Sequence, residues 1–348
     1  MWQYPVSLLS YLAVAVIVIF LSIKLSTFVD LLDKKTNLSG ALLGGVLLAA
    51  TTSLPELFTS LTASLLVKDN SLVVGDILGS NLFNITLFTI IYLFFFKKML
   101  KGKVSKHHIF NMLVIGTLYG VVTLAGYVFN FYHLLWGWFN PLSILIVVIY
   151  GITLWKTPKE EVNEEAIEDE KESKLSVKQI TVLFIIFALG LIGASVGITY
   201  LTSWVVNVYG FGSTFGGALF LGVATSLPEL TSTINLSRRG NINAAYGNII
   251  GSNVFNFLIL AIADLFSFNC KTTLYTFDQS AFLLIIFGIA SSLILFITLV
   301  LKLKGVVKDS GKSKAIFYIS GIIFVLNYVA FLILSNINLH ILFAPFAA

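Results

Sequence analysis

Residues 52–57 read Thr-Ser-Leu-Pro-Glu-Leu, and residues 225–230 repeat the same six letters. A second block follows each copy: residues 75–84 read Gly-Asp-Ile-Leu-Gly-Ser-Asn-Leu-Phe-Asn, and residues 247–256 match seven of those ten positions. From the glutamate of the first block to the last asparagine of the second, the separation is 28 residues in one copy and 27 in the other. Matched blocks at matched spacing indicate an internal repeat.

The composition around the repeat is that of a membrane protein. Of the 348 residues, 57% are hydrophobic and 11% are charged, and the mean hydropathy is +0.94. Soluble proteins carry about 25% charged residues. Apolar runs of about 20 residues are long enough to span a bilayer as helices, and the chain has ten of them, near residues 6–29, 38–67, 71–96, 109–129, 134–155, 176–201, 213–237, 242–267, 279–301 and 315–337. We therefore expect an all-α polytopic protein with no room for a folded soluble head.

The basic residues predict how these helices are oriented. If the N-terminus is outside, the cytoplasmic loops hold 19 of the 22 Lys and Arg residues, as the positive-inside rule requires. Both termini are then extracellular or periplasmic. The expected location is the plasma membrane, or inner membrane, of a prokaryotic cell.

The chain divides into two halves of five predicted spans. Residues 1–155 hold the first repeat (about 40–92), and residues 176–348 hold the second (about 213–266). Because each half has an odd number of spans, the second copy must enter the membrane from the opposite side. Inverted repeats of this kind place a substrate site near the midplane, between the copies. The acidic segment 156–175 joins the halves and is interpreted as a solvated linker, with a weak cytoplasmic Ca²⁺ sensor as the alternative.

Glu56 and Glu229 lie deep within predicted spans, where an ionisable group costs several kcal/mol and needs a partner or a function. Each follows a proline, which removes a backbone donor and leaves the carbonyl four residues earlier, that of Thr51 or Ala224, without its helical bond. A single kinked helix could use its glutamate for an interhelical hydrogen bond alone. Two inverted copies with matched polar residues favour an ion site instead.

Helical spacing places Ala49, Thr52 and Ser53 on one helix face with Glu56, and Gly222, Thr225 and Ser226 on one face with Glu229. In the partner helices, Ser80 and Asn84 lie one turn apart, as do Ser252 and Asn256. Carboxylate, carbonyl, hydroxyl and amide oxygens suit hard cations such as Ca²⁺ and Na⁺, whereas Zn²⁺ and Cu⁺ prefer the His and Cys ligands that the repeat lacks. The two carboxylates match one Ca²⁺ or two Na⁺ in charge.

The two blocks resemble the alpha-repeats of the Ca²⁺/cation antiporter superfamily, and specifically its sodium/calcium exchanger branch. The resemblance covers about 35 residues in each half, and the span layout extends it over the chain. It implies a secondary antiporter that exchanges Ca²⁺ for Na⁺ by alternating access at four adjacent cation positions. Glu56 and Glu229 would bridge Ca²⁺ or share Na⁺, the carbonyls of Thr52 and Thr225 would help to coordinate Ca²⁺, and the first and sixth spans would slide against the remaining core.

The resemblance assigns the remaining oxygens to flanking Na⁺ positions: the carbonyls of Ala49 and Gly222 and the hydroxyls of Ser53, Ser80, Ser226 and Ser252. It implies no cofactor, no enzymatic activity and no nucleic-acid partner. Beyond the lipid bilayer, the expected partners are the transported Ca²⁺ and Na⁺ ions, with H⁺ as an alternative. We expect the protein to function as a monomer.

Two positions depart from the exchanger pattern. Many sodium/calcium exchangers carry Asp in one copy where this chain has Asn84 and Asn256, which leaves H⁺ coupling open as the alternative to Na⁺. Asp76 stands where the second copy has Asn248. We hypothesise that Asp76 lies on the extracellular access path, where it would concentrate cations or bind a competing proton. The alternative is a hydrogen-bonded substitute for asparagine.

Two other classes of function remain. A passive divalent-cation channel is disfavoured because paired glutamates at one central site should bind too tightly for rapid conduction. An intramembrane enzyme using one glutamate as a general base is disfavoured because no nucleophile–base set accompanies either residue.

Overall fold

The computed structural model describes residues 2–36, 50–127, 139–157, 175–267, 274–306 and 311–337. Within these ranges all regular secondary structure is helical, which agrees with the expected fold class. Ala49, most of the acidic linker and the first part of the predicted second span lie outside the described residues.

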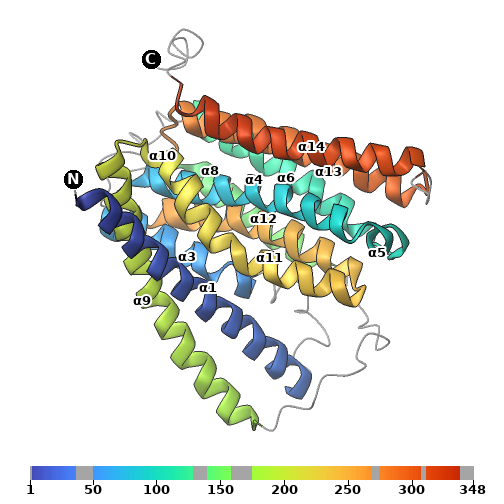
Figure 1. Cartoon of the computed structure of the whole chain (residues 1–348), viewed down its shortest axis with the longest axis horizontal. Coiled ribbons are helices and arrows are strands. Elements are labelled where there is room, and N and C mark those ends of the chain that lie inside the picture. The colour runs from blue at the N-terminus through green and yellow to red at the C-terminus, as the bar shows by residue number, and fades with distance from the viewer. Residues whose placement is uncertain are drawn as a thin grey trace.

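Each half of the chain contributes a similar series of helices (Figure 1). The first half contains α1 (Gln3–Thr36), α3 (Leu54–Thr62), η1 (Ala63–Val67), α4 (Asn70–Phe94), α5 (Phe96–Lys101), α6 (His107–Tyr127) and α8 (Pro141–Lys156). The second half contains α9 (Val177–Tyr209), α10 (Ser213–Gly216), η4 (Gly217–Leu221), α11 (Gly222–Arg239), α12 (Ile242–Leu265), α13 (Gln279–Leu303) and α14 (Gly311–Leu334). The elements η1 and η4 are short π-helices.

The helices show that this is a multi-pass membrane protein. In the described part of the chain, six are long and apolar enough to cross a bilayer: α1, α4, α6, α9, α12 and α13. Three shorter apolar helices lie at Leu54–Val67, Pro141–Lys156 and Tyr318–Leu334. Each predicted span contains a described helix, but length and composition identify fewer than ten spans.

Helices α4 and α12 form the centre of the molecule. They are counterparts in the repeat, they pack against each other, and 72% of the most apolar segment of each is buried. Asp69 caps the start of α4 by accepting hydrogen bonds from Ser71 N and Leu72 N, and Asn241 caps α12 by accepting one from Ala244 N. The second block of each repeat therefore lies on a fully surrounded helix.

Helices α1 and α9 form a pair that leans away from the rest of the molecule (Figure 1). They share a hydrophobic cluster of their own, separate from the main core, which includes Leu25, Leu191 and Ile198. Their outer faces expose large apolar side chains such as Leu9, Val16 and Leu189, as a lipid-facing surface does. Leu221 and Ala224, beside the second repeat motif, join this cluster, so the pair lies against the repeat.

Two glycines of α4 allow unusually close packing against α10 and the π-helix η4 of the other half. A Cβ on Gly75 would lie 2.1 Å from the carbonyl oxygen of Thr214, and a Cβ on Gly79 would lie 2.5 Å from Cα of Ala218. The backbones of the two copies are therefore in contact here, in the manner of small-residue interfaces in membranes. This contact fixes the depth at which the two repeats meet.

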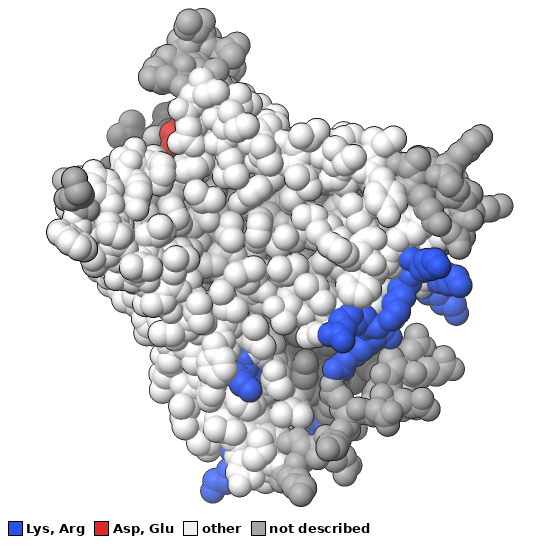
Figure 2. Space-filling view, viewed as in Figure 1, with Lys and Arg blue, Asp and Glu red and all other residues white. Residues whose placement is uncertain are grey.

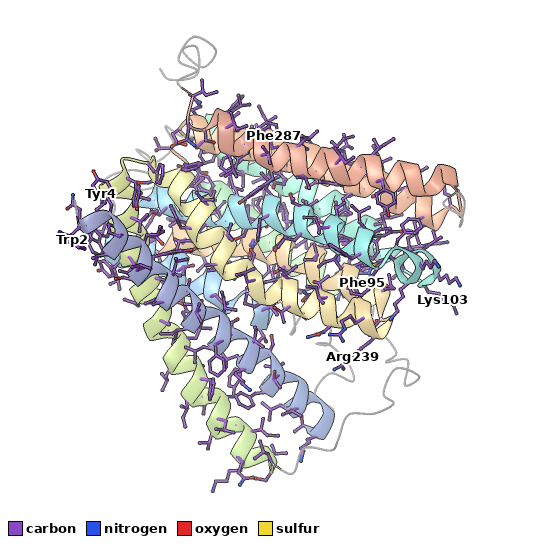
Figure 3. All side chains as sticks on the ribbon, in the orientation of Figure 1. Trp2, Tyr4, Phe95, Lys103, Arg239 and Phe287 are labelled. Carbon is purple, nitrogen blue, oxygen red and sulfur yellow. The ribbon has the colours of Figure 1, made fainter. Side chains whose placement is uncertain are left out.

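The largest group of basic side chains on the face drawn in Figure 2 lies where α5 and α11 end, and smaller groups lie over α1 and α9. Lys98 Nζ donates a hydrogen bond to the carbonyl oxygen of Arg238, joining two loops that the charge pattern assigns to the same side. Lys103 and Arg239 lie at this end, whereas Trp2 and Tyr4 lie at the opposite one (Figure 3). The arrangement is that of a membrane protein with a basic face and an aromatic interface.

Candidate cation site

The identical letters Thr-Ser-Leu-Pro-Glu-Leu adopt different backbones in the two copies. In the first, the helix is interrupted at Ser53, and α3 starts at Leu54 with Pro55 in its first turn. In the second, α11 continues through Pro228, and the irregularity lies one turn earlier, in the π-helix η4. Glu56 is thus in the first turn of its helix, where unpaired N–H groups favour negative charge.

Glu229 is held by serines from both copies. Its Oε1 accepts hydrogen bonds from Ser53 Oγ at 2.8 Å and from Ser252 Oγ at 2.9 Å, and the two hydroxyls lie 2.5 Å apart. All three side chains are fully buried. Ser53 comes from the first repeat motif and Ser252 from α12, so one carboxylate oxygen joins the two halves. Its other oxygen, Oε2, accepts no hydrogen bond.

Glu56 is also fully buried, and neither of its carboxylate oxygens accepts a hydrogen bond. It lies close enough to both Glu229 and Asp76 to interact with them electrostatically. Two ionised carboxylates buried side by side are strongly unfavourable without a compensating charge. A cation between them would supply that charge.

The other predicted ligands bring the two copies together in the same way. Ser80 Oγ donates to the carbonyl oxygen of Gly222 at 3.3 Å. Asn84 Nδ2 donates to Asn253 Oδ1 at 3.0 Å, and Asn256 Nδ2 donates to Asn81 Oδ1 at 2.9 Å. Each of these bonds connects one half of the chain with the other.

Six buried oxygens of the predicted ligand set lack a hydrogen-bond partner in the described structure. They are Glu56 Oε1, Glu56 Oε2, Glu229 Oε2, Asn84 Oδ1, Asn256 Oδ1 and Ser226 Oγ. Most buried oxygens in proteins have a partner, and each exception needs a cause. Ca²⁺ takes six to eight oxygen ligands, so these oxygens are of the kind and number that a hard cation uses.

The two threonines of the motif are buried as well. Thr225 Oγ1 donates to the carbonyl oxygen of Leu221 at 2.9 Å, the usual back-bond of a threonine in a helix. The backbone carbonyl of Thr225 lies close in sequence to Pro228, the proline inside α11. Thr52 is fully buried immediately before the interruption at Ser53. Ala49, the remaining predicted carbonyl donor, lies outside the described residues.

Asp76 is fully buried rather than open to an aqueous path. Its Oδ2 accepts hydrogen bonds from Thr59 Oγ1 at 2.6 Å and Ser60 Oγ at 3.2 Å, and its Oδ1 accepts one from Thr225 Oγ1 at 3.4 Å. These hydroxyl groups hold the Asp76 side chain in place. Asp76 therefore brings a third carboxyl group close to Glu56.

The counterpart in the second copy uses the opposite chemistry. Asn248 Nδ2 donates to the backbone oxygen of Glu229 at 3.2 Å and to Thr233 Oγ1 at 3.0 Å. An aspartate could not donate to that carbonyl, so Asp76 is not simply an asparagine replaced by its isostere. The position is an acceptor in one copy and a donor in the other.

Asp264, near the end of α12, is a buried polar residue that the sequence pattern did not single out. Its Oδ2 accepts hydrogen bonds from Asn140 N at 2.8 Å and Ser143 Oγ at 2.7 Å, and Ser143 is hydrogen-bonded in turn to Tyr275. These bonds attach the start of α8 to α12. The signal that the sequence offered for Asp264 was its position, an acidic residue in the last turn of an apolar run.

No group of three His, Cys, Asp or Glu side chains in the described ranges is arranged to hold a metal ion. The site therefore depends on oxygens of several kinds, with carboxylates in the minority. All its described side chains are buried.

Comparison with known proteins agrees with this geometry. Residues 6–156 and 181–336 match the sodium/calcium exchanger protein family, one segment in each half of the chain. The chain belongs to that family. Its members exchange cations across membranes, so the protein is a membrane cation exchanger of the Ca²⁺/cation antiporter superfamily.

The following relative and solved structures share less than 25% sequence identity with this chain. The inner membrane protein YrbG of Escherichia coli is 24% identical over 247 residues, which cover 70% of this chain and 74% of YrbG. The crystal structure of the H⁺/Ca²⁺ exchanger CAX superposes with a TM-score of 0.66 at 15% identity, covering 94% of this chain and 88% of CAX. A structure of the sodium-calcium exchanger NCX_Mj superposes with a TM-score of 0.57 at 19% identity, covering 93% and 96%. At these identities the structural likeness establishes the fold.

Proposed function

We propose that the protein exchanges Ca²⁺ for Na⁺ across the plasma or inner membrane at the site between Glu56 and Glu229. The observation that carries this proposal is the set of six buried oxygens without hydrogen-bond partners, drawn from both copies of the repeat. In this proposal Ca²⁺ lies between the two glutamates, near the carbonyls of Thr52 and Thr225.

Two flanking groups of oxygens support Na⁺ as the counter-ion. One consists of Ser53, Ser252 and Glu229 Oε1, within hydrogen-bonding distance of one another. The other is Ser80 with the carbonyl oxygen of Gly222. A proton needs only a carboxylate to bind, whereas hydroxyl and carbonyl oxygens grouped around a charge suit a monovalent metal ion.

Charge balance explains why such a site exchanges ions. When it is empty, the glutamates leave uncompensated negative charge in the membrane, which is costly to move between its two faces. One Ca²⁺ or several Na⁺ remove that cost. Switching between the faces then occurs with either ion bound, and each ion must leave before the other binds.

The paired helices α1 and α9 support the proposed conformational change. Their hydrophobic cluster is separate from the main core and meets the second repeat motif at Leu221 and Ala224. We propose that this pair slides over a core that stays fixed, so that the buried site opens to one side at a time. The proposal includes ten spans, with both termini outside and residues 1–155 and 176–348 as the two halves.

A proton-coupled Ca²⁺ antiporter is the second candidate. It is favoured by the asparagines at both 84 and 256, which reduce the charge available for Na⁺. The two candidates share the same Ca²⁺ site and differ in the ion that drives transport.

Transport in vesicles separates these candidates. Purified protein reconstituted into Na⁺-loaded vesicles and diluted into Na⁺-free buffer should accumulate ⁴⁵Ca²⁺, and collapsing the Na⁺ gradient with an ionophore should abolish uptake. Uptake driven by an imposed pH gradient alone would show that H⁺, and not Na⁺, is the coupled ion. Non-saturating uptake without any counter-ion would indicate a channel.

Asp76→Asn should weaken Ca²⁺ binding by about tenfold, equivalent to about 1.4 kcal/mol, because it removes a buried negative charge close to Glu56. The fold should be retained, since asparagine has the shape of aspartate and its Oδ1 can still accept from Thr59 Oγ1 and Ser60 Oγ. Equilibrium ⁴⁵Ca²⁺ binding to the purified protein checks the effect. Asp264→Asn, the same substitution beside α8, serves as the control and should leave binding unchanged. Equal affinity in the Asp76 variant and the wild type would show that Asp76 is structural only.

A further inference from the structure

We propose that Asn81 and Asn253 are positioning residues, each of which fixes the amide orientation of a cation ligand in the opposite copy of the repeat. Asn81 orients Asn256, and Asn253 orients Asn84, so that both ligands present oxygen rather than NH₂ to the ion. This inference rests on the proposed cation site and does not depend on which ion is coupled.

The hydrogen bonds define the orientation of each amide. Asn256 Nδ2 donates to Asn81 Oδ1, and Asn84 Nδ2 donates to Asn253 Oδ1. Asn253 Nδ2 also donates to the backbone oxygen of Asn81 at 3.1 Å. Rotating either ligand amide by 180° would place its oxygen against another amide oxygen. The rotation would also leave the NH₂ group without this acceptor, at a cost of about 1–3 kcal/mol in a buried site.

The two ligand asparagines share helix faces with serines of the site. Asn84 is one helical turn after Ser80, and Asn256 is one turn after Ser252, so each shares a helix face with a serine of the site. Ser252 is bonded to Glu229 and Ser80 to the Gly222 carbonyl. All four asparagines are at most 1% exposed, so water cannot replace a missing partner at the amides.

This arrangement is needed because the ligands are amides. A carboxylate at 84 or 256 would present an oxygen to the cation in either orientation, whereas an amide repels a cation when it is turned around. Asparagine keeps the charge of the site low, but its orientation must be imposed by a neighbour. Asn81 and Asn253 supply that constraint across the interface between the copies.

A double-mutant cycle on Ca²⁺ affinity tests the pairing. In purified protein in lipid nanodiscs, Asn81→Leu should weaken equilibrium ⁴⁵Ca²⁺ binding at least tenfold. In an Asn256→Asp background the same Asn81→Leu change should alter affinity by less than threefold, because the carboxylate has no wrong orientation. In an Asn84→Asp background the loss should remain at least tenfold, because Asn81 does not orient Asn84. Asn81→Asp, which keeps the acceptor, should retain binding.

A purely structural role for Asn81 would give the same loss in all three backgrounds, and that result would overturn the proposal, as would undiminished binding by Asn81→Leu alone. Melting temperatures without Ca²⁺ confirm that each variant is folded, and Asn81→Ala replaces Asn81→Leu if leucine does not fit. Failure of the wild type to bind Ca²⁺ would overturn both this inference and the proposed function. Binding with proton-driven transport would overturn only the Na⁺ coupling.

Discussion

Replacing Glu56 by glutamine should reduce Ca²⁺ uptake by at least 100-fold while leaving the protein folded. Neither carboxylate oxygen of Glu56 is held by a close hydrogen bond, so the substitution removes a charge while keeping the shape of the side chain. A 100-fold loss corresponds to about 2.7 kcal/mol of cation binding, which is modest for one of two central carboxylates. ⁴⁵Ca²⁺ uptake and binding by the same preparation measure both effects.

The same variant should also melt at a higher temperature than the wild type when cations are removed. Glu56 lies near Glu229 and Asp76, and removing one of several buried like charges relieves their repulsion. Glu229→Gln is the matched control. It should also lose transport, yet gain less stability, because the Oε1 of Glu229 already accepts two hydrogen bonds. Normal uptake by Glu56→Gln, or failure of this variant to fold, would contradict the assignment.

Gly75→Ala should lower the melting temperature by roughly 10 °C and reduce the yield of folded protein, because one added carbon would overlap the backbone of the other half. The Cβ would lie 2.1 Å from Thr214 O and 2.9 Å from Ala218 N, and backbone atoms between packed helices cannot move aside independently. Overpacking of this kind costs about 3 kcal/mol or more. Thermal unfolding monitored by fluorescence-detected size-exclusion chromatography measures the effect.

The repeat itself supplies the control for this experiment. Gly247 is the counterpart of Gly75, but a Cβ there would meet only His108 Cε1, at 3.5 Å, an ordinary contact. Gly247→Ala should therefore change the melting temperature by no more than about 2 °C. Equal effects at the two positions would show that the close contact between α4 and η4 is not what limits stability.

Several features of this site could be predicted from sequence because membrane physics restricts them strongly. Glutamates 56 and 229 stood out because charge inside an apolar run is costly, and both are fully buried. The structure also brings Ser53, Ser80 and Ser252 into bonds between the copies, as a site shared by the repeats requires.

Other features depend on contacts that a single sequence does not reveal. Identical motif letters gave an interrupted helix before Glu56 and a continuous helix at Glu229, a difference that the shared letters cannot encode. For Asp76 the sequence left two hypotheses open, an access-path carboxylate or a hydrogen-bonded substitute for asparagine, and could not show the hydroxyls of Thr59, Ser60 and Thr225 that lie beside it. The pairing of Asn81 with Asn256 required knowing which faces of α4 and α12 meet.

The most direct test of the account is to locate a bound divalent cation. Crystals grown with Sr²⁺ in place of Ca²⁺ should show one strong anomalous-scattering peak within coordination distance of carboxylate oxygens from both Glu56 and Glu229, and the peak should be absent from Glu56→Gln crystals. A principal peak elsewhere, for example beside Asp264, or one that persists unchanged in the variant, would contradict the claim that the two inverted repeats share a single central cation site.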